Sequence, residues 1–150
     1  MRATSFVCSS VWLLGFLGGC SQPIEPDRSL PIEQQWQLQP GSTIAGRQVA
    51  GGLGDISIEL NGDRVYAPAD GRVQPVKTNP ICVVFEAPEI PAYLFRLCGI
   101  RNPKLGEVQQ GEAIGRADDL QFAALRRQPD GKWAMVEPSR QILEQTLKPS

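Results

Sequence analysis

The chain has 150 residues, among them 15 basic and 16 acidic ones, which give a net charge of −1, and it contains no histidine. Nucleic-acid binding needs a concentrated basic face, and the pair Arg126-Arg127, which we expect at a solvated strand end, does not provide one, so no nucleic-acid partner is expected. The lack of histidine removes the imidazole group that catalytic metal sites and acid–base catalysts most often use.

The N-terminus has the pattern of an export signal. Arg2 is the only charge before Glu25, and residues 6–17 form an apolar stretch that is shorter than the roughly 20 residues of a membrane-spanning helix. Residues 17–20, Leu-Gly-Gly-Cys, resemble the lipobox of bacterial lipoproteins, which is cleaved before the cysteine. The resemblance implies acyl chains on Cys20, and two or more chains give a stable membrane anchor. The alternative is an ordinary cleaved signal with an incidental cysteine.

The lipobox also sets the expected boundaries and location. Residues 1–19 would be the signal peptide, residues 20–34 the lipidated cysteine and a proline-rich flexible tether, and residues 35–150 a single domain. Cleavage removes Arg2 and no acid, so the mature chain is expected to carry a net charge of about −2. We therefore expect an exported protein anchored to a membrane of the cell envelope, and Ser21 favours the outer membrane.

From Trp36 onward, short apolar runs separated by glycine, proline, asparagine and aspartate predict a mainly β domain. Residues 55–60 alternate, which places Ile56, Ile58 and Leu60 on one face of a strand. The dipeptide Asn61-Gly62 predicts a hairpin turn, with residues 64–67 as the returning partner strand.

Three further segments complete this prediction. Residues 71–76 and 120–125 are expected strands, and Asp130-Gly131 predicts a turn into a strand over residues 133–136. Near the C-terminus, Ser139 is expected to cap a short helix that buries Ile142, Leu143 and Leu147.

The four cysteines divide by position. Cys8 would leave with the signal and Cys20 would carry lipid, which leaves Cys82 and Cys98 in a compartment that permits disulfides. They flank two expected strands, residues 82–85 and 93–98, joined by a turn with two prolines at residues 87–91. A cross-strand disulfide fits this hairpin, and two buried thiols are the alternative.

Two segments carry a resemblance to a known family. Residues 65–73, V-Y-A-P-A-D-G-R-V, and residues 105–115, L-G-E-V-Q-Q-G-E-A-I-G, resemble the strand–turn–strand blocks of LytM/lysostaphin-type peptidoglycan endopeptidases. The end of the chain resembles the closing strand and short helix of that family, so the similarity spans about residues 50–143. It implies a compact antiparallel β domain, a sandwich or half-barrel, with a short C-terminal helix.

The zinc ligands of that family are not retained at the matching positions. The family uses His-x-x-x-Asp and His-x-His, and these align with Gly51 to Asp55 and with Asp119 to Gln121. A further histidine of the family falls near Leu97 or Cys98. Asp55 is thus the one ligand retained, so the resemblance implies a domain with no bound zinc, no other cofactor and no hydrolytic activity.

The resemblance implies a binding role instead. Some members of the family that lack the catalytic residues are envelope lipoproteins that activate cell-wall amidases. We expect a lipid-anchored, inactive LytM-like protein that binds or regulates a cell-wall enzyme or peptidoglycan. The former zinc-site positions, Gly51, Asp55, Asp119 and Gln121, would line its cleft, with Tyr66 nearby.

Other functions stay open. The two blocks also resemble biotinyl and lipoyl carrier domains and efflux adaptors, for which Lys77 or Lys104 would be the modified residue, although neither has the Met-Lys context of such carriers. A peptidoglycan-binding domain without a regulatory role is a second alternative. An enzyme that works through Asp55, Asp119 and glutamates alone is the third.

Overall fold

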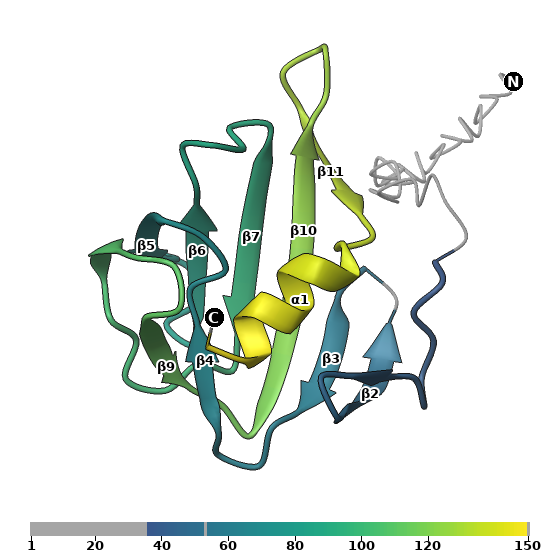
Figure 1. Cartoon of the computed structure of the whole chain (residues 1–150). Helices are drawn as coiled ribbons and strands as arrows, with labels where there is room; N and C mark the ends of the chain where they lie inside the picture. Colours follow the sequence, from purple (N-terminus) through teal and green to yellow (C-terminus); the bar gives the residue numbers. More distant parts are fainter. Residues whose placement is uncertain (1–35, 53, 150) are drawn as a thin grey trace, which may run out of the picture.

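The computed structural model describes residues 36–52 and 54–149 (Figure 1). The expected signal peptide, Cys20 and the tether lie outside these residues. The described part is mainly antiparallel β structure with one short C-terminal helix, α1 (Arg140–Leu147), and its large sheet does not close into a barrel. This agrees with the mainly β class that the sequence predicts. Within these residues no helix has the length and apolar character needed to cross a membrane.

The large sheet has nine strands. Its order is β1 (Thr43–Ile44), β2 (Arg47–Gly52), β3 (Ile56–Glu59), β10 (Asp119–Arg127), β7 (Tyr93–Cys98), β6 (Cys82–Glu86), β5 (Gly71–Pro75) and β8 (Gly106–Val108). The long strand β10 pairs with β7 along one edge, and its other edge pairs first with β3 and then with β11 (Trp133–Val136). A second sheet consists of β4 (Arg64–Tyr66) and β9 (Ala113–Arg116).

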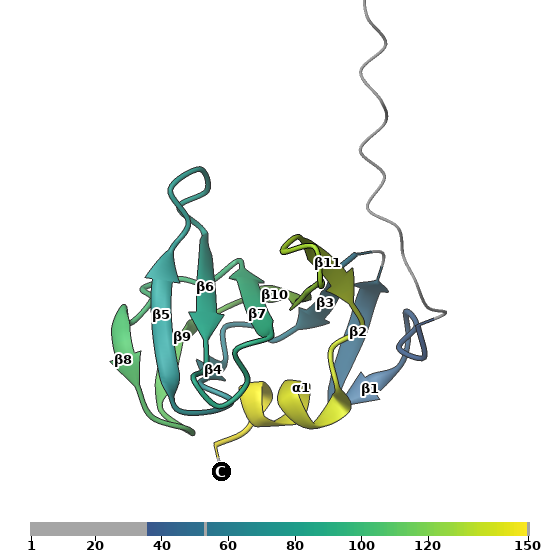
Figure 2. The ribbon, with the colours of Figure 1, turned by 90° about the horizontal axis from the view of Figure 1, so that it is seen from above.

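The hydrophobic core lies on the inner face of the large sheet, where α1 lies across it (Figure 2). Ile56, Ile58 and Leu60 are buried together, as the alternation predicts. The Ser139 hydroxyl accepts a hydrogen bond of 3.2 Å from the backbone N–H of Ile142, which confirms the expected N-cap. Leu143 of α1 is fully buried in the same core.

The turn at Asn61-Gly62 forms, but the strand pairing predicted for it is wrong. Both residues have positive φ, 53° and 88°. The next strand, β4, does not return along β3, because it pairs with β9 in the small sheet, while β3 pairs with β2 and β10. The dipeptide thus encodes a local reversal of the backbone, and Val65 of β4 is fully buried in the hydrophobic core.

Two other hairpins form as expected. β6 and β7 pair with Phe85 opposite Phe95, so the connection turns about residue 90, and a disulfide joins Cys82 to Cys98 across the pair. β10 and β11 form the second hairpin, in which Gly131 has a φ of 82°. The covalent bond removes the alternative of two free thiols.

The two sequence blocks over residues 65–73 and 105–115 join into one substructure. β4 pairs with β9 and β5 pairs with β8, so each block contributes to both sheets. The Asp70 carboxylate accepts a hydrogen bond of 2.8 Å from the backbone N–H of Gln110. A Cβ atom on Gly71 would lie 2.2 Å from the Glu86 carbonyl oxygen, so this position requires glycine. We call residues 65–73 and 105–115 the framework.

Candidate functional site

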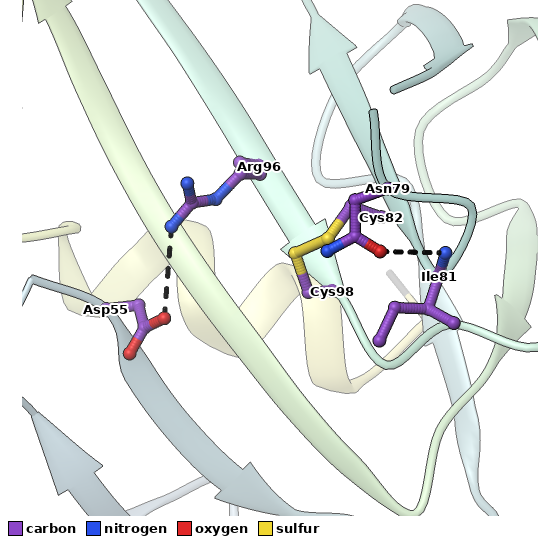
Figure 3. The surroundings of a disulfide bond; sticks show 6 residues. All are labelled: Asp55, Asn79, Ile81, Cys82, Arg96 and Cys98. Atoms are coloured by element: carbon purple, nitrogen blue, oxygen red, sulfur yellow. Dashed lines mark hydrogen bonds and ion pairs between the residues drawn. A yellow bond between two sulfur atoms is a disulfide. The ribbon is translucent and has the colours of Figure 1, made fainter. Parts of the chain in front are cut away.

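The four positions that the sequence resemblance aligns with zinc ligands, Gly51, Asp55, Asp119 and Gln121, lie on the outer face of the large sheet, which we define as the face opposite the core and α1. The strand register sets one row of neighbouring residues across five strands, consisting of Gly51, Ser57, Gln121, Cys98 and Cys82. Paired residues of antiparallel strands point to the same side of a sheet, so all five share the outer face. Figure 3 shows this face around the disulfide, with α1 behind the strands.

The remaining predicted positions lie on the same face. Asp119 is two residues before Gln121 on β10 and pairs with Glu59. Asp55 directly precedes buried Ile56, so it points outward, and its carboxylate lies 3.9 Å from the Arg96 guanidinium on β7 (Figure 3). The four predicted residues are therefore brought to one face by three adjacent strands.

The structure decides between two positions that the sequence left open, and it places one expected neighbour elsewhere. Of the two positions left open for a further family histidine, Leu97 is fully buried in the core, so Cys98 is the one on the outer face. Tyr66 is not brought to the site. It lies on β4 in the small sheet, whose only partner among the described residues is β9.

The side chains present do not fit a zinc ion. Gly51 has no donor atom, and the Cys98 sulfur is committed to a disulfide. Gln121 offers only an amide, and the Asp55 carboxylate faces a guanidinium. Within residues 36–52 and 54–149 no three His, Cys, Asp or Glu side chains lie close enough together to hold a metal. No step of a reaction can be derived through a metal with this donor set.

The outer face changes character along the strands. At one end Met135, Leu125 and Leu94 form a row across β11, β10 and β7, and all three are partly exposed. At the other end Glu59 and Asp119 stand side by side and are exposed. This apolar row was not predicted from the sequence. The available signal was that β7 and β10 each carry leucine on both faces of the sheet, Leu94 and Leu97 on β7 and Leu120 and Leu125 on β10.

A groove borders the apolar end of this face. It has a volume of about 490 Å³ and lies beside Trp133, whose side chain is among the most exposed large hydrophobic groups of the described residues, at 37%. Its polar lining comes from β5, β6, β8 and β10 and consists of Arg72, Gln74, Glu86, Glu107 and Arg127, beside Tyr93. The Gln74 amide donates to the Glu86 carboxylate at 3.0 Å.

The two lysines considered for a carrier role differ in their surroundings. Lys77 is exposed in the connection between β5 and β6. Lys104 forms an ion pair with Glu112. Neither residue lies on a strand of the outer face.

Comparison with protein-family models finds no match for this chain, and comparison with curated proteins finds none either.

Proposed function

We propose that this chain is a lipid-anchored, catalytically inactive LytM-like protein of the cell envelope that binds and regulates a cell-wall enzyme. The observation that supports it most is the row of Gly51, Gln121 and Cys98. Gly51 and Gln121 align in sequence with histidines of the family, and Cys98 is one of the two positions near which a further family histidine falls. The three residues are neighbours on one face of the large sheet and carry no imidazole.

The composition of the outer face favours a protein partner. A protein interface typically has an apolar centre and a polar rim, and interface cores are depleted of charge. The row of Met135, Leu125 and Leu94 is apolar and partly exposed, and the acids Glu59 and Asp119 lie beyond it. A cell-wall amidase with a matching apolar patch and basic rim is the partner that this arrangement favours.

Binding to peptidoglycan is the second candidate, and the groove at Trp133 favours it. An exposed indole offers a flat apolar surface to a sugar ring, and nearby amide, carboxylate and guanidinium groups can bond its hydroxyls. Sedimentation with purified cell-wall sacculi tests this candidate separately from enzyme binding.

A matched pair of variants tests the leading proposal in the full-length protein. Gln121→Arg places a bulky cation on the outer face, and Gln141→Arg places the same group on the exposed side of α1, across the molecule. We expect Gln121→Arg to weaken binding to an envelope amidase at least tenfold, and Gln141→Arg to leave it unchanged. A folded wild-type protein that neither binds nor activates any amidase of its own envelope would rule the proposal out.

The anchor needs its own experiment. Metabolic labelling with a radioactive fatty acid is expected to mark the wild-type chain and not the variant Cys20→Ser. Equal labelling of both, or none of either, would contradict a lipid on Cys20.

A further inference from the structure

A second cavity lies on the inner side of the molecule, and nine of its ten lining residues do not line the groove at Trp133. It has a volume of about 360 Å³ and opens where the start of β7 and the end of β10 meet the start of α1. Its walls are mainly apolar, and they include Ile90, Tyr93, Phe95, Val136 and Ile142. Pockets of this size and character are typical of sites for small molecules.

The rings on one wall make the cavity suited to a flat ligand. Tyr93 and Phe95 are stacked, with ring centroids 6.5 Å apart and an angle of 9° between their planes. Phe95 is nearly buried and packs against Phe122 in the core, so this wall is rigid. An aromatic group inserted here would meet ring faces and aliphatic side chains.

The charges in the lining favour an anion. Arg126 is the one cation of the lining, and it takes part in no ion pair within residues 36–52 and 54–149. Glu137 is the one acid, and its carboxylate accepts a hydrogen bond of 2.8 Å from the backbone N–H of Leu38. A carboxylate at the Arg126 end would gain a charge-assisted hydrogen bond at little cost to existing contacts.

We infer that this cavity binds a small aromatic carboxylate, with the ring against Tyr93 and Phe95 and the carboxylate on Arg126. This site does not rest on the function proposed for the outer face, and Tyr93 is the one lining residue that it shares with the groove at Trp133. It gives Arg126 and Arg127, adjacent on β10, different roles: Arg126 lines the cavity, whereas Arg127 lies on the outer face opposite Trp133.

Titration of the purified full-length protein with 1-naphthoate and with the neutral 1-naphthamide tests the inference. We expect naphthoate to bind and Arg126→Gln to weaken that binding about tenfold, the loss of one charge-assisted contact. The control Arg127→Gln removes the neighbouring charge, and partition of the probe into any lipid is the same for both variants. The affinity for naphthamide is expected to be lower and the same in all three proteins.

Nuclear magnetic resonance locates the probe directly, because bound naphthoate is expected to give cross-peaks to the methyl groups of Val136 and Ile142, which line this cavity and not the groove at Trp133. Three results would overturn the inference: no binding of naphthoate to the folded wild-type protein, equal affinity for naphthoate and naphthamide, or equal weakening by Arg126→Gln and Arg127→Gln. Bound probe without contacts to Val136 or Ile142 would likewise exclude this cavity.

Discussion

The framework and the outer-face row differ in what their residues contribute to folding. In the framework, Gly71 is fixed by a close approach to β6 and Asp70 joins two distant segments. In the row, Gly51 has only ordinary van der Waals contact around its missing side chain, and Gln121 is exposed. The architecture therefore depends on the first region, whereas Gly51 and Gln121 in the second can change their chemistry without loss of the fold.

The largest difference between the two regions is expected from replacing one glycine by alanine in each of them. Gly71→Ala would place a Cβ atom 2.2 Å from the Glu86 carbonyl oxygen and 2.7 Å from the Phe85 ring. Because the nearest of these atoms belongs to the backbone and cannot move aside, we expect a loss on the order of 4 kcal/mol in the free energy of unfolding, measured by urea denaturation.

Gly51→Ala is the matched control for this substitution. Its new Cβ would lie 3.8 Å from Ser57, so we expect the free energy of unfolding to change by less than about 0.5 kcal/mol. Similar losses in the two variants would show that the outer-face row is as constrained as the framework.

The Cys82–Cys98 disulfide is the one part of the row with a clear structural role. It joins two residues with a sequence separation of 16. A cross-link over a loop of that length lowers the conformational entropy of the unfolded chain, which stabilises the folded protein by about 3 kcal/mol. We expect the double variant Cys82→Ala/Cys98→Ala to lose about 3 kcal/mol in the free energy of unfolding, measured by urea denaturation.

A reducing agent provides the control. It is expected to bring the wild-type protein close to the stability of the double variant and to leave the double variant itself unchanged. If oxidised and reduced wild-type protein unfold at the same urea concentration, the disulfide adds nothing to stability and its role lies in the chemistry of the outer face.

A smaller effect is expected from Asp70. Its carboxylate bonds the backbone N–H of Gln110, 40 residues away, and so links the two halves of the framework. Asp70→Ala is expected to cost about 1 kcal/mol in the free energy of unfolding, measured by thermal or urea denaturation.

Asp130→Ala is the comparison for this bond. Asp130 bonds the backbone N–H of Lys132, only two residues away, at 3.0 Å, so its loss affects a local turn and is expected to cost about half as much. An equal or larger loss from Asp130→Ala would mean that the long-range bond does not hold the framework together.

The sequence predicted those parts of the fold that are encoded locally. The alternation around Ile56, the cap at Ser139 and the hairpins that contain Gly131 and the disulfide all depend on nearby residues. The partner of β4 was not predictable in this way, because it depends on contacts between segments about 50 residues apart in the chain. A turn dipeptide fixes a reversal of the backbone and does not specify the sheet that the next strand joins.

The candidate site was partly predictable for the same reason. The family resemblance pointed to Gly51, Asp55, Asp119 and Gln121, and the strand register places them on one face. The contact between Asp55 and Arg96 and the cavity at Arg126 required the tertiary arrangement, since β3, β7 and β10 come from distant parts of the sequence. Spacing along the chain carries no information on which strands lie next to each other.

The ion pair between Asp55 and Arg96 is expected to have the smallest effect on the free energy of unfolding. It tests whether the outer face contributes to stability as the framework does. Its atoms are 3.9 Å apart and both side chains are about one-third exposed, so solvent screens the attraction. In a double-mutant cycle with Asp55→Asn and Arg96→Gln, we expect a coupling of less than about 0.5 kcal/mol in the free energy of unfolding. A coupling well above 1 kcal/mol would give this face a structural role like that of the framework. A small coupling leaves both groups available to a bound partner, and each variant should then weaken amidase binding with little change in stability.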